Sequence, residues 1–339
     1  TGIQVQNLDQ AASATITAEF YPQQEGEMKS FPQTAAAGAA ANFFLPQLDG
    51  LADGAYAAIV NSDRQIAAIA RTDWAQSLAA GTYSNVIPGL DVALPLVVKQ
   101  YVGQCSLVSI QNTNTSASGT ATVEIYQVGV ADAKFTKSYT IRRGSSVTLQ
   151  LCTDDDFETT IPTNFLGSMR VKSQDGVTKF GVQSFVNLTK SGQEKAVYAF
   201  EGVPADQAST TLYAPLFRKK QALSGGATGV TGISVVNTES TLVDVTVEYY
   251  PTVSTACPSG NMVSEAHSID GNSSYVFYQG GGPVPDGCYG SAKITATGKI
   301  LAIVNDSVPK GGVYNAEAAA YNAVPADQAG TLVALPLFR

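Results

Sequence analysis

The chain has 339 residues, of which only 14% are charged, and acidic residues exceed basic ones by 8. This charge balance excludes nucleic acid as a partner, because phosphate binding requires clustered Lys and Arg side chains. No apolar run approaches the roughly 18 residues that a membrane-spanning helix needs, so we expect no membrane insertion. A hydrophobic content of 44% is sufficient for several small cores.

The chain opens on the segment TGIQVQN at Thr1, which has two later homologues, CSLVSIQN (105–112) and TGISVVN (231–237). Because no Met and no basic, apolar leader stand at the start, we expect a mature product whose targeting peptide has been removed. An apolar segment stands ahead of both later copies, as VALPLVVK (92–99) and LYAPLFRK (212–219). The first copy has no such segment before it, so the first unit is expected to lack its leading strand.

Three aligned segments alternate between polar and apolar residues, which predicts strands that have one wet and one buried face. They are ITAEFY (16–21), TVEIYQ (122–127) and VTVEYY (245–250). Each has a glutamate on its polar side: Glu19, Glu124 and Glu248. These carboxylates lie in different units, so we interpret them as members of cross-strand surface pairs and not as a catalytic set.

Two further strands are expected later in each unit. The first follows a glycine, as AYAAIV after Gly54, SMRVKS after Gly167 and SAKITA after Gly290. The second is QIAAIA (65–70), FGVQSFVN (180–187) and ILAIVN (300–305). Helical periodicity is nearly absent, and turn signals separate the strands: Asp175-Gly176, Asp270-Gly271 and Thr297-Gly298. The pattern predicts an all-β protein built of antiparallel sandwiches.

A repeat of about 120 residues organises these segments. Pro95, Pro215 and Pro336 are spaced by 120 residues (215 − 95) and 121 residues (336 − 215), and VPADQA occurs at both 203–208 and 324–329. This period suits one small sandwich per repeat. We therefore predict three tandem immunoglobulin-like domains, the first of them incomplete, followed by a donor strand: 1–90, 91–208, 209–329 and 330–339.

Four cysteines fall in two pairs, one in the second unit and one in the third. Their spacing fits no zinc signature, and the single histidine, His267, cannot complete a ligand set with them. We predict intradomain disulfides Cys105–Cys152 and Cys257–Cys288. Such bonds imply an oxidising, extracellular setting for a secreted or cell-surface protein.

The last segment of the chain, LVALPLFR (332–339), matches the two apolar leading segments. A sandwich without one strand exposes an apolar groove and unpaired backbone groups, which proteins normally cover. Since proline has no N–H donor, the segment suits an added strand where the ladder is open. Burying three of its aliphatic side chains would contribute about 5 to 8 kcal/mol before ordering costs. We predict that it fills the groove of a neighbouring copy, with donor residues Val333, Leu335, Pro336, Leu337 and Phe338 and acceptor residues Ile3 and Val5.

These motifs resemble a repeat of bacterial extracellular proteins, in which units of the form SVQNTG…VTVTYY…GSAVVTS…IAAVVN…YLPLV follow one another. The resemblance covers all three units and rests on IQVQN, SIQNT and SVVNT, on the EFY, EIY and EYY strands, on GSAKITA with ILAIVN, and on ALPLV and ALPLF. It implies surface or secreted modules, similar to subunits of extracellular fibrils joined by donor-strand exchange. The second unit departs from the pattern with FGVQSFVN and a longer insertion near Asp154.

Residues with catalytic or ligand-binding chemistry are few, and no nucleophile, phosphate-binding or zinc-protease motif is present. We interpret His267 as a surface strand residue. One acidic run offers oxygen ligands for calcium, but a solvated loop is favoured because the spacing lacks glycines; the run is Asp154, Asp155, Asp156 and Glu158. Four aromatic residues are candidates for a glycan-stacking platform, against the favoured interpretation as half-buried aromatics; they are Trp74, Tyr21, Tyr126 and Tyr250. We expect no enzyme, no catalytic residue, no metal and no cofactor.

Two classes of function follow. The preferred class is a structural subunit of an extracellular filament, since a tail that completes the first domain of the next copy forms a head-to-tail contact, which generates an open polymer unless it closes into a ring. Its partners are identical subunits, and a glycan is a further candidate ligand. The alternative is an adhesive or carbohydrate-binding repeat fragment of a larger cell-surface protein, in which a preceding unit supplies the strand in cis.

Overall fold

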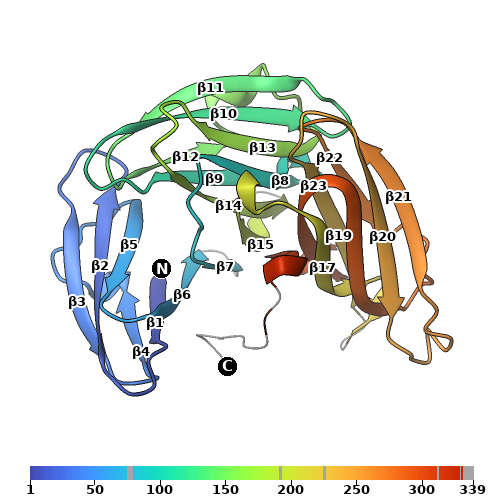
Figure 1. The fold of residues 1–339 in the computed structure, drawn as a ribbon, viewed down its shortest axis with the longest axis horizontal. Coiled ribbons are helices and arrows are strands. Elements are labelled where there is room, and N and C mark those ends of the chain that lie inside the picture. Colours follow the sequence, from blue (N-terminus) through green and yellow to red (C-terminus); the bar gives the residue numbers. More distant parts are fainter. Residues whose placement is uncertain (75–78, 191–192, 224–226, 311–312, 329, 331–339) are drawn as a thin grey trace.

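The structure is a computed structural model that describes the chain except for residues 75–78, 191–192, 224–226, 311–312, 329 and 331–339. It is nearly all β, as predicted, with antiparallel sheets. The described residues contain no helix that is long and apolar enough to cross a membrane. We call residues 1–90, 91–208 and 209–329 repeats 1, 2 and 3. Their strands follow one another around an arch, from repeat 1 in blue to repeat 3 in orange and red (Figure 1).

Repeat 2 contains two rows of strands that its first strand, β8, joins into one sheet. One row has the order β11-β10-β13-β8, and the other has the order β12-β9-β14-β15. β8 pairs with β13 along most of its length and with β9 at its end. The bounds are β8 (Asp91–Tyr101), β9 (Gln104–Asn112), β10 (Gly119–Gln127), β11 (Ala133–Ile141), β12 (Ser146–Gln150), α1 (Asp155–Glu158), β13 (Phe165–Ser173), β14 (Phe180–Lys190), β15 (Gln193–Glu201), β16 (Val203–Pro204) and η2 (Ala205–Gln207).

Repeat 3 has the same two rows, β21-β20-β23-β17 and β22-β19-β23-β24. Its β23 belongs to both rows, because it runs through the predicted turn at Thr297-Gly298 and crosses from one row to the other. Two predicted strands are therefore one long strand. The bounds are β17 (Ser209–Arg218), β18 (Gln221–Ala222), β19 (Thr228–Asn237), β20 (Val243–Pro251), β21 (Val263–Ile269), β22 (Ser274–Tyr278), β23 (Tyr289–Lys310), β24 (Val313–Asn322), β25 (Val324–Pro325) and η4 (Ala326–Gln328).

Repeat 1 has a complete row β4-β1-β6-β7 and a row of only three strands, β3-β2-β5. Each repeat has its own main hydrophobic cluster, formed by side chains of both rows. The bounds are β1 (Gly2–Asn7), β2 (Ala14–Pro22), β3 (Lys29–Ala35), β4 (Ala40–Phe44), η1 (Leu45–Gln47), β5 (Tyr56–Ser62), β6 (Ile66–Trp74) and β7 (Ala79–Ser84).

The three polar and apolar strands predicted from the sequence are β2, β10 and β20. The predicted cross-strand pair is present for Glu124, with Lys172, and for Glu248, with Lys293, whereas the hydrogen bond of Glu19 lies within its own strand. In each strand, the tyrosine two residues after the glutamate donates its hydroxyl hydrogen bond to that carboxylate, at 2.9, 2.6 and 3.1 Å. Lys172 lies 2.7 Å from Glu124 on the neighbouring strand. Burial raises the pKa of Glu124, but hydrogen bonds from Lys172 and Tyr126 outweigh burial and lower this pKa below its ordinary value.

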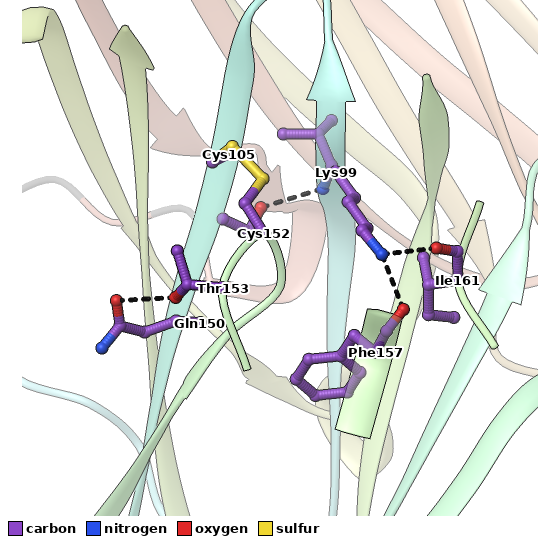
Figure 2. Close-up of a disulfide and its surroundings, with 9 residues drawn as sticks. Lys99, Cys105, Gln150, Cys152, Thr153, Phe157 and Ile161 are labelled. Carbon is purple, nitrogen blue, oxygen red and sulfur yellow. Dashed lines mark hydrogen bonds between the residues drawn. A yellow bond between two sulfur atoms is a disulfide. The ribbon is translucent and has the colours of Figure 1, made fainter. Parts of the chain in front are cut away.

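Both predicted disulfides, Cys105–Cys152 and Cys257–Cys288, are present. Near the first of them, the buried Lys99 reaches from β8 to the turn around α1 (Figure 2). Its Nζ donates to the carbonyls of Phe157 at 2.6 Å and Ile161 at 2.7 Å. The leading strand of repeat 2 is thereby tied to its longest insertion.

We expect the substitution Lys99→Met to lower the free energy of unfolding of repeat 2 by about 3 kcal/mol, because two buried carbonyls would lose a charged donor. Urea denaturation followed by circular dichroism measures this change. Lys134→Met is the matched control, since Lys134 is exposed on β11. Equal urea midpoints for the two variants would show that the Lys99 contacts add nothing to stability.

Candidate functional site

Repeat 1 differs from the other two repeats at one edge of β5. In repeat 2 the corresponding strand, β13, pairs there with β8, and in repeat 3 the first half of β23 pairs with β17. Among the described residues, β5 pairs with β2 and with no other strand. The Ala58 carbonyl of β5 accepts instead a hydrogen bond from the side-chain amide of Gln111 in repeat 2, at 3.3 Å. This edge is therefore available to an added strand.

The pairing of β5 with β2 gives each residue of β5 a counterpart in β13 and in β23. Ala58 corresponds to Met169 and Ala292. Val60 corresponds to Val171 and Ile294, and Tyr56 corresponds to Gly167 and Gly290. The sequence alignment that placed Gly54 with these two glycines was wrong by two residues, because Gly54 precedes the strand and the glycines lie within theirs.

A groove of about 680 Å³ lies beside β5. Repeat 1 lines it from both of its rows, and repeat 2 contributes the opposite wall. Val60 is only half-buried there, whereas its counterparts Val171 and Ile294 are fully buried. The lining residues of repeat 1 that matter below are Thr1, Ile3, Phe20, Ala58, Val60 and Tyr83.

In repeats 2 and 3 the leading strand fills the corresponding space. Val92 and Leu94 of β8 are fully buried in the core of repeat 2. Leu212, Ala214 and Phe217 of β17 are fully buried in the core of repeat 3. The groove of repeat 1 thus has the place of a strand that two repeats contain, with apolar side chains of repeat 1 on one side and a largely polar wall of repeat 2 on the other.

Proline lies in a β-bulge of each leading strand. β8 has two residues, starting with Pro95, where β13 has one, and β17 has the same bulge at Pro215. The ladder is open at this point, as expected for a strand that contains a proline. Because the bulge shifts the alternation by one residue, Phe217 is buried and Leu216 is only half-buried. The regular alternation of buried and exposed side chains in β17 therefore does not continue past the proline.

The predicted acceptor residues Ile3 and Val5 lie in β1, which pairs with β4 on one side and β6 on the other. β1 therefore has no free backbone groups for an added strand. Ile3 lines the groove through its side chain, while Val5 is fully buried in the core of repeat 1. The predicted donor residues lie outside the described residues: Val333, Leu335, Pro336, Leu337 and Phe338.

The other candidate residues form no second site. His267 is exposed on β21 and stacks on Tyr275, with ring centroids 3.6 Å apart. Asp156 of the acidic run is bound by Lys137 at 2.6 Å and by the Tyr139 hydroxyl at 2.9 Å. The described residues contain no group of three or more His, Cys, Asp and Glu that could hold a metal ion.

Three of the four aromatic candidates for a glycan platform lie in separate repeats. Tyr21, Tyr126 and Tyr250 lie in β2, β10 and β20, which belong to three different repeats. Tyr21 and Tyr126 are buried, and only Tyr250 is exposed. The side chain of Trp74 lies outside the described residues.

No family model matches the chain, and no curated protein matches it significantly. Among solved structures, the chain is similar to one described as the crystal structure of Thermotoga maritima 1070, at 10% identity over 36% of this chain and 99% of that chain, with a TM-score of 0.29. It is also similar to an anti-sigma factor domain-containing protein, at 8% identity over 92% of this chain and 97% of that chain, with a TM-score of 0.14.

Proposed function

We propose that this protein is a structural subunit of an extracellular filament on a bacterial surface, built from three immunoglobulin-like domains. In the filament, residues 330–339 of one copy add a strand beside β5 of the next copy. The contact joins two different surfaces, so it repeats from copy to copy and forms an open polymer. The protein has no catalytic role in this proposal.

The observation that carries the proposal is the open edge of β5, together with the groove beside it. Two repeats of the same chain hold a strand of closely similar sequence at that position. Burying the donor side chains would contribute on the order of 5 kcal/mol, and pairing with β5 would give a partner strand to the backbone groups at its open edge.

The extracellular setting is supported by the two disulfides, since such bonds persist in oxidising compartments. They lie in repeats 2 and 3, on either side of the second leading strand.

Deletion of residues 330–339 tests the proposal. We expect the full chain to form filaments in negative-stain electron microscopy and the truncated chain to be monomeric by light scattering. A chain of full length that has both Leu335→Asp and Phe338→Asp should also be monomeric, because two charges would have to enter the apolar groove.

A synthetic peptide of residues 330–339 provides the reciprocal test. It should bind the truncated chain, and in excess it should shorten the filaments of the full chain by capping the groove. Filaments that persist after the deletion, or a full chain that stays monomeric at high concentration, would contradict the proposed polymer.

A further inference from the structure

In repeat 3, one tyrosine hydroxyl binds the bulge of the leading strand. The Leu216 N–H donates to Tyr321 Oη at 3.0 Å, and the Tyr321 hydroxyl donates to the Leu216 carbonyl at 2.6 Å. Leu216 follows the proline, at the point where the bulge takes its backbone out of the ladder. The hydroxyl thus satisfies both backbone groups that the bulge leaves without a partner strand.

A second hydroxyl binds the leading strand two residues further along. Thr231 Oγ1 accepts a hydrogen bond from the Arg218 N–H at 2.6 Å. In repeat 2, Ser106 Oγ accepts one from the Val98 N–H at 2.9 Å. Both hydroxyl residues are buried. The contact therefore occurs in each of the two repeats that contain a leading strand.

Repeat 1 has a hydroxyl at both corresponding positions. In repeat 3, the strand pairing from β19 to β23 and then to β24 leads to Tyr321. In repeat 1, the same pairing from β1 to β6 and then to β7 leads to Tyr83. Thr1 corresponds to Thr231. The Thr1 carbonyl accepts a hydrogen bond from the backbone N–H of the first residue after β4, and the Thr231 carbonyl accepts one from the backbone N–H of the first residue after β22. Both residues line the groove, and none of the residues that the structure describes hydrogen-bonds the Tyr83 hydroxyl.

The final segment of the chain has the sequence that these two hydroxyls serve in repeat 3. Residues 336–339 read PLFR, as do residues 215–218 of β17. Leu337 then corresponds to Leu216 and Arg339 to Arg218. In repeat 2, by contrast, the segment is PLVV, and Phe200 takes the place of the tyrosine.

The residue two positions before Pro336 fits the opposite wall of the groove. Ala93 of β8 packs against apolar side chains of repeat 3, whereas β17 has the exposed Tyr213 at that position. The corresponding residue of the final segment is Ala334, and the wall that repeat 2 presents to the groove includes Gln111 and Gly181. A small residue is needed where a strand lies between two repeats, and the final segment has one.

We propose that Tyr83 and Thr1 fix the register of residues 336–339 of a second copy in this groove, an inference that rests on the proposed function. The Tyr83 hydroxyl hydrogen-bonds both backbone groups of Leu337, and the Thr1 hydroxyl accepts a hydrogen bond from the N–H of Arg339.

This register also places the apolar donor side chains. Leu335 lies opposite Ala58, and Val333 lies opposite Val60. Phe338 enters the core, as Phe217 does against Tyr249 in repeat 3, where the ring centroids are 5.1 Å apart. The counterpart of Tyr249 in repeat 1 is Phe20, which lines the groove.

The experiment measures the affinity of the peptide 330–339 for the chain that lacks these residues. Tyr83→Phe should weaken binding roughly tenfold, because it removes two hydrogen bonds and little volume. Tyr321→Phe makes the same change where the strand is already present, and it should leave the affinity unchanged. Thr1→Val should weaken binding severalfold, and Thr1→Ser should restore it.

A peptide with an ester in place of the Leu337 amide isolates the contact, since the ester lacks the N–H. The ester peptide should bind the unsubstituted chain more weakly than the parent peptide does. The substitution Tyr83→Phe should then lower the affinity for the ester peptide much less than it lowers the affinity for the parent peptide. Parent affinities that agree within twofold for Tyr83→Phe and the unsubstituted chain would overturn the assignment of Tyr83 and leave the proposed function standing. A parent peptide that does not bind the unsubstituted chain would overturn both.

Discussion

A chain in which a donor strand precedes Thr1 is expected to be monomeric and to have a more stable repeat 1. The fusion places residues 330–339 ahead of residues 219–230, followed by the whole chain from Thr1. Residues 219–230 serve as the linker because they connect the corresponding positions in repeat 3, from Arg218 at the end of β17 to Thr231 in β19. The strand then reaches β5 within one molecule, at an effective concentration that a second copy cannot match.

The expected gain comes from side chains that enter the groove in this fused chain. Val333, Leu335 and Phe338 would contribute roughly 1.5 to 3 kcal/mol each before the cost of ordering the strand. A net gain of about 2 kcal/mol would raise the melting temperature of a domain below 100 residues by roughly 8 to 16 °C. Tryptophan fluorescence reports this transition for repeat 1 alone, because the chain has a single tryptophan, Trp74.

The matched control has the same fusion with Leu335→Asp and Phe338→Asp in the added strand only. It should polymerise as the unmodified chain does, because the groove of repeat 1 stays open. Filaments formed by the fused chain with the unaltered strand would place the intersubunit contact elsewhere and would contradict the role of β5.

Removal of the Cys105–Cys152 disulfide should destabilise repeat 2 more than any surface change. The bond closes a loop with a sequence separation of 47 residues. Cross-linking such a loop lowers the conformational entropy of the unfolded chain, which stabilises the folded state by about 4 kcal/mol at 25 °C. Since a domain is stable by only about 5 to 15 kcal/mol, the double substitution of both cysteines by alanine would remove a large part of this stability.

Urea denaturation of the chain that lacks residues 330–339, followed by hydrogen exchange in each repeat, measures this loss without interference from assembly. Substitution of Cys257 and Cys288 is the comparison: that loop has a separation of 31 residues, so the loss should be slightly smaller and confined to repeat 3. A urea midpoint of repeat 2 that does not move would show that the Lys99 contacts and the core hold the insertion without the bond.

Local patterns in the sequence were sufficient for the strands and for the disulfide pairs. The alternation in residues 16–21, 122–127 and 245–250 predicts β2, β10 and β20, because the side-chain period of a strand is a property of a few consecutive residues. The internal repeat adds long-range information, since it identifies an apolar leading segment in two units and a matching segment at residues 332–339.

The site itself required the register between strands that lie far apart in the chain. The sequence assigned Ile3 and Val5 as acceptors, since β1 follows the leading segment in the repeat, but β1 is paired on both sides and the open edge belongs to β5. The sequence did not identify Tyr83 as a site residue, because its counterpart in repeat 2 is a phenylalanine. The role of Tyr83 is inferred from the hydrogen bond that the Tyr321 hydroxyl donates to the leading strand of repeat 3.

The sequence by itself determined the all-β class, the period of the repeat, the cysteine pairs and the segment that resembles a leading strand. Only the tertiary structure decided which edge is open, that a bulge at the proline buries Phe217 in place of Leu216, and which hydroxyl-bearing residues line the groove. The physical reason is that alternation depends on neighbours along the chain, whereas hydrogen-bond register joins residues that are tens of positions apart.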